Sequence, residues 1–117
     1  MVTKKEYFIE YIKRLDLYTE VAKTAFEAYF EGLVRANQRV NLFSRKMEIE
    51  DIWTKHFIDS VSIFEVFRNW DEKNVLDFGT GGGLPGIPIK IISPSSEMTL
   101  LDSTKKKINT VQMIVDS

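Results

Sequence analysis

The chain has 117 residues, of which 44% are hydrophobic and 12% aromatic, a composition typical of a globular domain and not of a disordered segment. Sixteen basic residues against seventeen acidic ones leave a net charge of -1, so the total charge indicates no preference for nucleic acid. The absence of cysteine excludes disulfides and thiolate metal sites, and the single His56 cannot form a metal centre alone.

The hydropathy pattern also argues against a membrane protein. The N-terminal segment carries charged residues at short intervals and lacks the unbroken apolar core of a signal peptide. No apolar run approaches the length of a membrane span. We therefore expect a soluble, cytoplasmic protein with no membrane partner and no metal.

Three amphipathic helices are predicted in the first part of the chain. Thr3 followed by Glu6 matches a capping box, and apolar residues at helical spacing behind it predict a helix over 4–15. A second apolar stripe keeps a three-to-four spacing and predicts a helix over 19–40. A third stripe predicts a helix over 48–68, with His56 on its inner face.

The pattern changes after Trp70 to alternating strands and helices. We predict a strand over 75–78, a helix over 84–92, a strand over 98–101 and a helix over 104–115. This order is typical of the beginning of a parallel α/β sheet. The right-handed crossover would place the two strands side by side. The chain is therefore divided into an N-terminal helical cap, 1–70, and the first half of a nucleotide-binding α/β domain, 71–117.

Two parallel strands do not form a stable sheet alone, because parallel sheets bury both faces and need further strands along their edges. We therefore expect this polypeptide to be a fragment of a longer protein, or to need a partner that completes the sheet. The alternative is a small helical domain with a two-stranded appendage.

A glycine loop joins the first strand to the next helix, in the sequence D-F-G-T-G-G-G-L-P-G from Asp77 to Gly86. Glycine permits positive φ in a tight turn and removes the side chain that would keep the backbone away from a ligand. Pro85 suits the start of the helix, where its missing N–H would have no partner. A site of this design favours a nucleotide laid across the strand ends.

Two registers of this loop imply different ligands. Gly81-x-Gly83-x-x-Gly86 matches the dinucleotide fingerprint of NAD enzymes. Asp77-x-Gly79-x-Gly81-x-Gly83 fits better, because its first glycine directly follows the strand. Asp77 would repel a pyrophosphate and would suit S-adenosyl-L-methionine, which carries an ammonium and a sulfonium. Asp102, at the end of the second strand, is placed to accept hydrogen bonds from both ribose hydroxyls.

Four segments together resemble the bacterial GidB/RsmG family, whose members methylate guanine N7 in small-subunit (16S) ribosomal RNA. They are N-L-F-S (41–44), K-H-F-I-D-S (55–60), V-L-D-F-G-T-G-G-G-L-P-G-I-P (75–88) and T-L-L-D-S (99–103). They occur in the family's order, so the resemblance covers about residues 20–115.

This resemblance implies an N-terminal helical cap followed by a Rossmann-like class I methyltransferase sheet, with S-adenosyl-L-methionine as cofactor and small-subunit ribosomal RNA as partner. It also implies that family members are roughly twice as long, so that this chain would be an inactive fragment. Carried over by motif, the residues lining the cofactor would be Gly79, Gly81, Gly83 and Leu84. The residues holding the ribose side would be Asp102, Ser103 and Thr104.

No catalytic residue is predicted, because guanine N7 has a free lone pair and loses no proton before it is methylated. Two interpretations of His56 remain open. It is either a structural histidine bonded to Asp59 or to a backbone carbonyl, or it shapes the cap over the cofactor pocket together with Asn41 and Asp59.

Five basic residues are candidates for phosphate contacts, although solvated surface charge is the default interpretation. They are Arg35, Arg39, Arg45, Lys46 and Lys55. Two other function classes stay open beside the RNA methyltransferase: an NAD-linked Rossmann enzyme, and a non-catalytic helical module whose glycine loop is structural.

Overall fold

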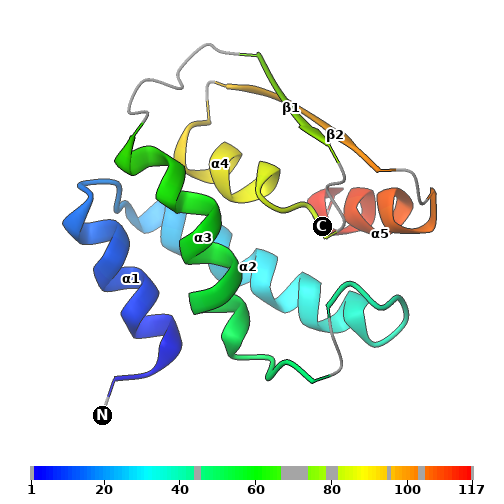
Figure 1. The fold of residues 1–117 in the computed structure, drawn as a ribbon, viewed down its shortest axis with the longest axis horizontal. Helices are drawn as coiled ribbons and strands as arrows, with labels where there is room; N and C mark the ends of the chain where they lie inside the picture. The colour runs from blue at the N-terminus through cyan, green and yellow to red at the C-terminus, as the bar shows by residue number, and fades with distance from the viewer. Residues whose placement is uncertain are drawn as a thin grey trace.

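The computed structural model describes residues 2–43, 46–66, 74–78, 82–94, 96–102 and 105–116. Helices form the N-terminal part of the chain, and two parallel strands alternate with two helices after it (Figure 1). The elements are α1 (Lys4–Arg14), α2 (Glu20–Asn37), η1 (Ile52–Phe57), α3 (Ile58–Val61), η2 (Ser62–Glu65), β1 (Asn74–Phe78), α4 (Gly86–Ile92), β2 (Glu97–Leu101) and α5 (Lys105–Asp116). None of the described helices is long and apolar enough to cross a membrane.

The first two helices begin where side-chain caps predict. The hydroxyl oxygen of Thr3 accepts a hydrogen bond from the backbone N–H of Glu6 at 3.0 Å, and that of Thr19 accepts one from Ala22 at 2.9 Å. Each cap satisfies a backbone donor that has no partner inside the helix. The predicted helix over 4–15 and the start of the predicted helix over 19–40 are confirmed, while α2 ends at Asn37.

The third helical segment differs from its prediction. A single α-helix was expected over 48–68, but the segment begins with the π-helix η1, passes through the four residues of α3, and ends in the 3₁₀-helix η2. Trp53, Phe57 and Val61 are buried at intervals of four residues. Because an α-helix turns every 3.6 residues, the wider π turn keeps these side chains on one face.

An aromatic cluster from α1, α2 and η1 forms the centre of the core. The ring centroids of Phe8 and Phe26 lie 4.8 Å apart, those of Phe26 and Phe57 5.3 Å, and those of Trp53 and Phe57 5.1 Å. Ile89 of α4 packs into the same core. The helix that follows the glycine loop is therefore held by the helical cap as well as by the sheet.

The two strands pair in parallel, as the predicted crossover requires. Val75 pairs with Met98, and Asp77 pairs with Leu100. Helix α4 lies between these strands and the helices α2 and α3 (Figure 1). Leu76 is 51% exposed, so the described residues leave part of the sheet uncovered. A parallel sheet normally has both faces covered.

Replacing Phe57 with Ala removes the ring that Phe8, Phe26, Tyr29 and Trp53 all contact. We expect the free energy of unfolding to fall by about 3–5 kcal/mol, measured by urea denaturation. Val66→Ala, at an exposed position, is the control and should change it by less than about 0.5 kcal/mol. Equal losses in the two variants would contradict the central position of Phe57.

Candidate functional site

A hydrogen bond to the side chain of Asp77 links the end of β1 to the start of α4. Its carboxylate is 7% exposed, and Oδ2 accepts a hydrogen bond from the backbone N–H of Gly86 at 2.9 Å. Gly86 is the first residue of α4, where backbone donors lack partners within the helix and a negative charge is favourable. The residue predicted to face a cationic ligand thus has a structural bond as well, and its contact with a ligand stays a prediction.

Two glycines in the C-terminal half of the loop are required by space or by backbone conformation. A Cβ atom on Gly86 would lie 2.4 Å from Leu100 Cδ2 and 2.8 Å from Asp77 Oδ2, so glycine lets α4 approach both strands. Gly83 has a φ of +95°, a conformation that side-chain-bearing residues rarely adopt. Its Cβ would also lie 2.4 Å from Ile87 Cδ1.

Tyr29 connects the helical cap to the glycine loop. Its hydroxyl donates a hydrogen bond to the backbone carbonyl of Gly82 at 2.7 Å, and its ring stacks on Phe57 with centroids 5.4 Å apart. Burial, and secondly the charge of Asp77, raise the pKa of Tyr29 well above its usual value. The phenol is therefore a neutral donor throughout the physiological pH range.

The helical spacing of Phe26, Tyr29 and Phe30 predicts that their rings pack in the core and do not form a platform for stacking bases. This is confirmed for Phe26 and Tyr29, which are buried, while Phe30 packs against the core and is partly buried. The bond from Tyr29 to the loop was missed. The available signal was the tyrosine itself, because a buried phenol usually has a hydrogen-bond partner that phenylalanine would not need.

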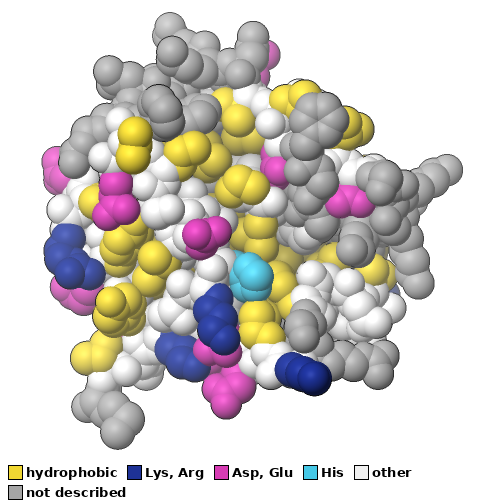
Figure 2. Space-filling model, viewed as in Figure 1, with side chains coloured by type: hydrophobic (Ala, Val, Ile, Leu, Met, Phe, Trp, Pro, Cys, Tyr) yellow, Lys and Arg dark blue, Asp and Glu magenta, His cyan; other side chains and the backbone are white. Residues whose placement is uncertain are grey.

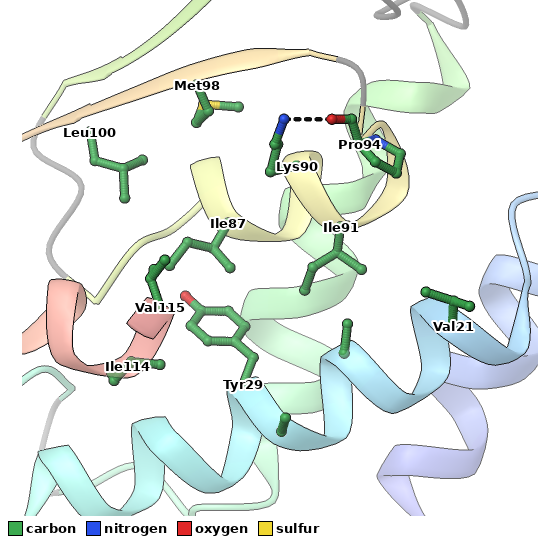
Figure 3. A pocket seen from close by; sticks show the side chains of 12 residues that line it. Val21, Tyr29, Ile87, Lys90, Ile91, Pro94, Met98, Leu100, Ile114 and Val115 are labelled. Atoms are coloured by element: carbon green, nitrogen blue, oxygen red, sulfur yellow. Dashed lines mark hydrogen bonds between the residues drawn. The ribbon is translucent and has the colours of Figure 1, made fainter. Parts of the chain in front are cut away.

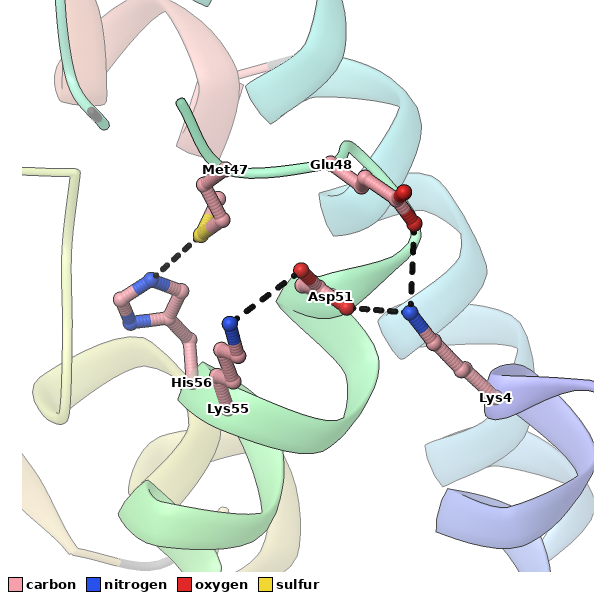
Figure 4. A network of polar contacts seen from close by, with 6 residues as sticks. All are labelled: Lys4, Met47, Glu48, Asp51, Lys55 and His56. Carbon is pink, nitrogen blue, oxygen red and sulfur yellow. Dashed lines mark hydrogen bonds and ion pairs between the residues drawn. The ribbon is translucent and has the colours of Figure 1, made fainter. Parts of the chain in front are cut away.

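The neighbours of the His56 ring differ from those of the structural interpretation, which expected Asp59 or a backbone carbonyl as its partner. Its Nε2 atom lies 3.2 Å from the sulfur of Met47, and its ring centroid lies 4.8 Å from that of Phe43 (Figure 4). The backbone carbonyl of His56 accepts the hydroxyl of Ser60 at 2.7 Å. Burial lowers the pKa of His56, and the charge of Asp59 opposes this shift. The imidazole is thus expected to be neutral near pH 7.

An ion-pair network lies beside His56 and joins α1 to the start of η1 (Figure 4). Lys4 pairs with Asp51 and also with Glu48, while Lys55 Nζ lies 3.4 Å from Asp51 Oδ2. Figure 2 shows the histidine at the surface, with cationic and anionic side chains on the same face. Lys55, one candidate for a phosphate contact, is thus held in an ion pair.

A hollow of about 230 Å³ lies between the third helical segment and α4, and we call it the α3–α4 hollow. It is lined by His56, Asp59, Ser60, Ile63, Leu84, Pro85 and Ile89. The structure thus brings together two of the three residues expected to shape the cap, His56 and Asp59. Asn41, the third, is exposed and does not line this hollow.

A larger pocket of about 610 Å³ lies between α2, α4, β2 and α5 (Figure 3). The described residues that line it are mostly aliphatic, and the one charged side chain among them, Lys90, donates to the carbonyls of Pro94 and Ser96. The hydroxyl of Tyr29 is bonded to Gly82. Because neither Asp77 nor Asp102 lines it, this pocket is not the predicted nucleotide site.

The predicted cofactor residues are only partly covered by the structure. Asp77, Gly83, Leu84 and Asp102 are described, whereas Gly79, Gly81, Ser103 and Thr104 lie outside the described residues. Asp102 directly follows β2, whose Leu101 pairs with Phe78 at the end of β1. Asp102 therefore lies at the same edge of the sheet as the start of the glycine loop. Among the described residues, no three acidic or histidine side chains are arranged to hold a metal ion.

The described candidates for phosphate contacts include Arg35, Arg39 and Lys55, which have different surroundings. Arg35 and Arg39 line a hollow of about 440 Å³ between the end of α2 and α5, together with Met113 and Ile114. Arg45 lies outside the described residues. The structure thus keeps Arg35 and Arg39 together and assigns Lys55 to the network at Asp51, so an RNA contact by any of them stays a prediction.

Replacing Gly86 with Ala should place a methyl group against Leu100 and Asp77 and separate α4 from the strands. We expect the free energy of unfolding to fall by about 1–3 kcal/mol in urea denaturation. Gly82→Ala is the control, because its Cβ would lie 3.2 Å from Leu33 Cδ2, a milder approach than the 2.4 Å at Gly86. A loss at Gly82 as large as that at Gly86 would contradict this explanation.

Replacing Tyr29 with Phe removes the donor to Gly82 and leaves the ring in the core. We expect a loss of about 1–3 kcal/mol of stability and faster hydrogen exchange of the amides in 82–87, measured by mass spectrometry. Tyr7→Phe, at an exposed phenol, should change neither quantity. Unchanged exchange in the Tyr29 variant would show that this bond does not hold the loop.

Comparison with known proteins gives a family. The family model described as rRNA small subunit methyltransferase G matches residues 22–117. The protein named ribosomal RNA small subunit methyltransferase G from Desulforamulus reducens is 40% identical over 97 residues, which cover 83% of this chain and 40% of the relative. The protein of the same name from Leuconostoc mesenteroides is 40% identical over 94 residues, which cover 79% of this chain and 39% of the relative. The one from Mycoplasma mycoides is 36% identical over 115 residues, covering 98% of this chain and 81% of the relative. The chain thus spans less than half the length of the first two relatives, and it belongs to the rRNA small subunit methyltransferase G (GidB) family.

Proposed function

We propose that the protein transfers a methyl group from S-adenosyl-L-methionine to guanine N7 of small-subunit ribosomal RNA. The observation that carries this proposal is the edge of the sheet where Asp77 and Asp102 end two parallel strands on either side of a glycine loop. The names of the relatives support ribosomal RNA as the substrate. Because the chain spans less than half of the first two relatives, the proposal concerns the whole protein.

The described residues fit this cofactor. Gly83 has a positive φ, which glycine adopts readily, so the backbone can make the tight turn that leads from the loop into α4. Asp102 is half-buried at the strand end, where a carboxylate can accept hydrogen bonds from a vicinal diol. Leu84 is half-buried and adds apolar surface beside the loop.

The cofactor supplies, when bound, a methyl group activated by its sulfonium. Guanine N7 has a free lone pair at neutral pH, so no side chain has to remove a proton from it. The protein's contribution is then to hold the acceptor and the cofactor in line and to exclude water from them.

The dinucleotide register has one observation in its favour, since Gly86 allows the close helix–strand contact expected of its third glycine. Pyrophosphates bind at free N–H groups of a helix N-terminus. Here the N–H of Gly86 is bonded to the Asp77 carboxylate, which would also repel a phosphate. S-adenosyl-L-methionine, which carries no phosphate, is therefore favoured over NAD.

Calorimetric titration of the protein expressed from its complete gene tests this proposal. We expect S-adenosylhomocysteine to bind and NAD not to bind, and we expect the protein to form 7-methylguanosine in unmethylated small subunits. Asp102→Ala should weaken S-adenosylhomocysteine binding by about ten-fold or more, because two hydrogen bonds to the ribose are lost.

Glu97→Gln is the control for Asp102→Ala, since Glu97 is exposed at the opposite end of the same strand. It should leave the affinity unchanged. Binding of NAD alone would overturn the proposed function, and binding of neither compound would favour a structural glycine loop.

A further inference from the structure

The α3–α4 hollow continues the candidate cofactor site beyond the glycine loop. Asp102 directly follows β2, the glycine loop leads from β1 to α4, and Leu84 and Pro85 belong to the last residues of this loop. These two residues form one wall of the hollow, and the segment containing His56 and Asp59 forms the other. A ligand whose ribose lies at Asp102 and which crosses the loop would thus reach this hollow with its far end.

We propose that the α3–α4 hollow holds the amino-acid end of S-adenosyl-L-methionine and that Asp59 binds its ammonium group. This inference rests on the proposed function and adds a residue of the helical cap to the cofactor site. The volume of about 230 Å³ is below the range of about 300–1,000 Å³ found for pockets that enclose a whole small ligand, and it suits one end of a longer molecule.

The charges around the hollow match an ammonium group. Asp59 is exposed and contributes a carboxylate, while burial lowers the pKa of His56, so this imidazole adds no positive charge near pH 7. Lys55, on the same segment, pairs with Asp51, and Lys90 of α4 donates to the carbonyls of Pro94 and Ser96. These cations are thus engaged away from Asp59.

The remaining walls suit the short methylene chain that separates the sulfonium from the amino acid. Ile63, Leu84, Pro85 and Ile89 supply aliphatic surface. The described lining of the hollow therefore combines an apolar wall with one anionic side chain. These two features match the methylene chain and the ammonium group of the ligand. Binding a cation through a carboxylate would give a charge-assisted hydrogen bond, which is stronger than a neutral one.

Asp77 is less suited to this role, although it lies on the other side of the same loop. Its carboxylate is 7% exposed, and one oxygen already accepts the N–H of Gly86. Asp59 is exposed and lines the hollow. The two acids thus have different roles: Asp77 bonds the start of α4, and Asp59 presents its charge to a ligand in the hollow.

The test compares S-adenosylhomocysteine, which has the amino-acid end, with 5′-methylthioadenosine, which lacks it. Both are titrated by calorimetry into the protein expressed from its complete gene, as wild type and as Asp59→Asn. We expect the substitution to weaken S-adenosylhomocysteine binding by about ten- to a hundred-fold and to leave 5′-methylthioadenosine binding unchanged.

Glu50→Gln is the matched control, because Glu50 is an exposed acid before η1 and does not line the hollow. It should change neither affinity. The melting temperature of each variant is measured beside the titrations, so that a loss of stability is recognised. Asp59→Glu keeps the negative charge and should therefore retain more S-adenosylhomocysteine affinity than Asp59→Asn.

Two results would overturn the inference while the proposed function stands. They are an Asp59→Asn variant with unchanged S-adenosylhomocysteine affinity, and one that loses affinity for both compounds equally. Failure of the wild-type protein to bind either adenosine compound would overturn the proposed function and this inference together.

Discussion

The hydrogen bond from the Gly86 amide to the Asp77 carboxylate joins helix α4 to strand β1, and the candidate site depends on this junction. It places a negative charge at the start of α4 and holds that helix against the end of β1. The missing side chain of Gly86 makes this approach possible, because a Cβ atom would overlap Leu100 and Asp77. The glycine loop between these points is thereby anchored at both ends, and its position follows from the packing of α4 in the core.

The helical cap is part of the same arrangement and not a separate cover. Ile89 packs among the aromatic side chains of the cap, and Tyr29 reaches from α2 to the carbonyl of Gly82. The π turn in η1 keeps Trp53 and Phe57 on the buried face, while His56 lies beside Met47 near the surface. Strand ends, loop and cap therefore meet at one edge of the molecule, where the proposed function places the cofactor.

Local sequence patterns predicted most of the helices and strands. They could not predict the contacts between segments that are distant in the chain. Thr3 marked a helix start because a cap depends on residues three apart, and the strands followed from short apolar runs. The η1 turn was missed because aromatic residues four apart fit an α-helix nearly as well as a π-helix. The bonds Tyr29–Gly82 and Asp77–Gly86 join separate elements, so no periodicity could indicate them. Of the predicted site residues, Gly79, Gly81, Ser103 and Thr104 lie outside the described part of the chain.

The bond between Tyr29 and Gly82 has a thermodynamic consequence. A ligand that orders the loop also fixes the acceptor of this bond, so part of its binding free energy must appear as added stability of α2 and the aromatic cluster. The coupling is reciprocal: any change that loosens the cap lowers the affinity of the loop for its ligand, even at positions far from it. Under the proposed function, substitutions in the helical core of this protein would therefore reduce cofactor affinity without touching the cofactor.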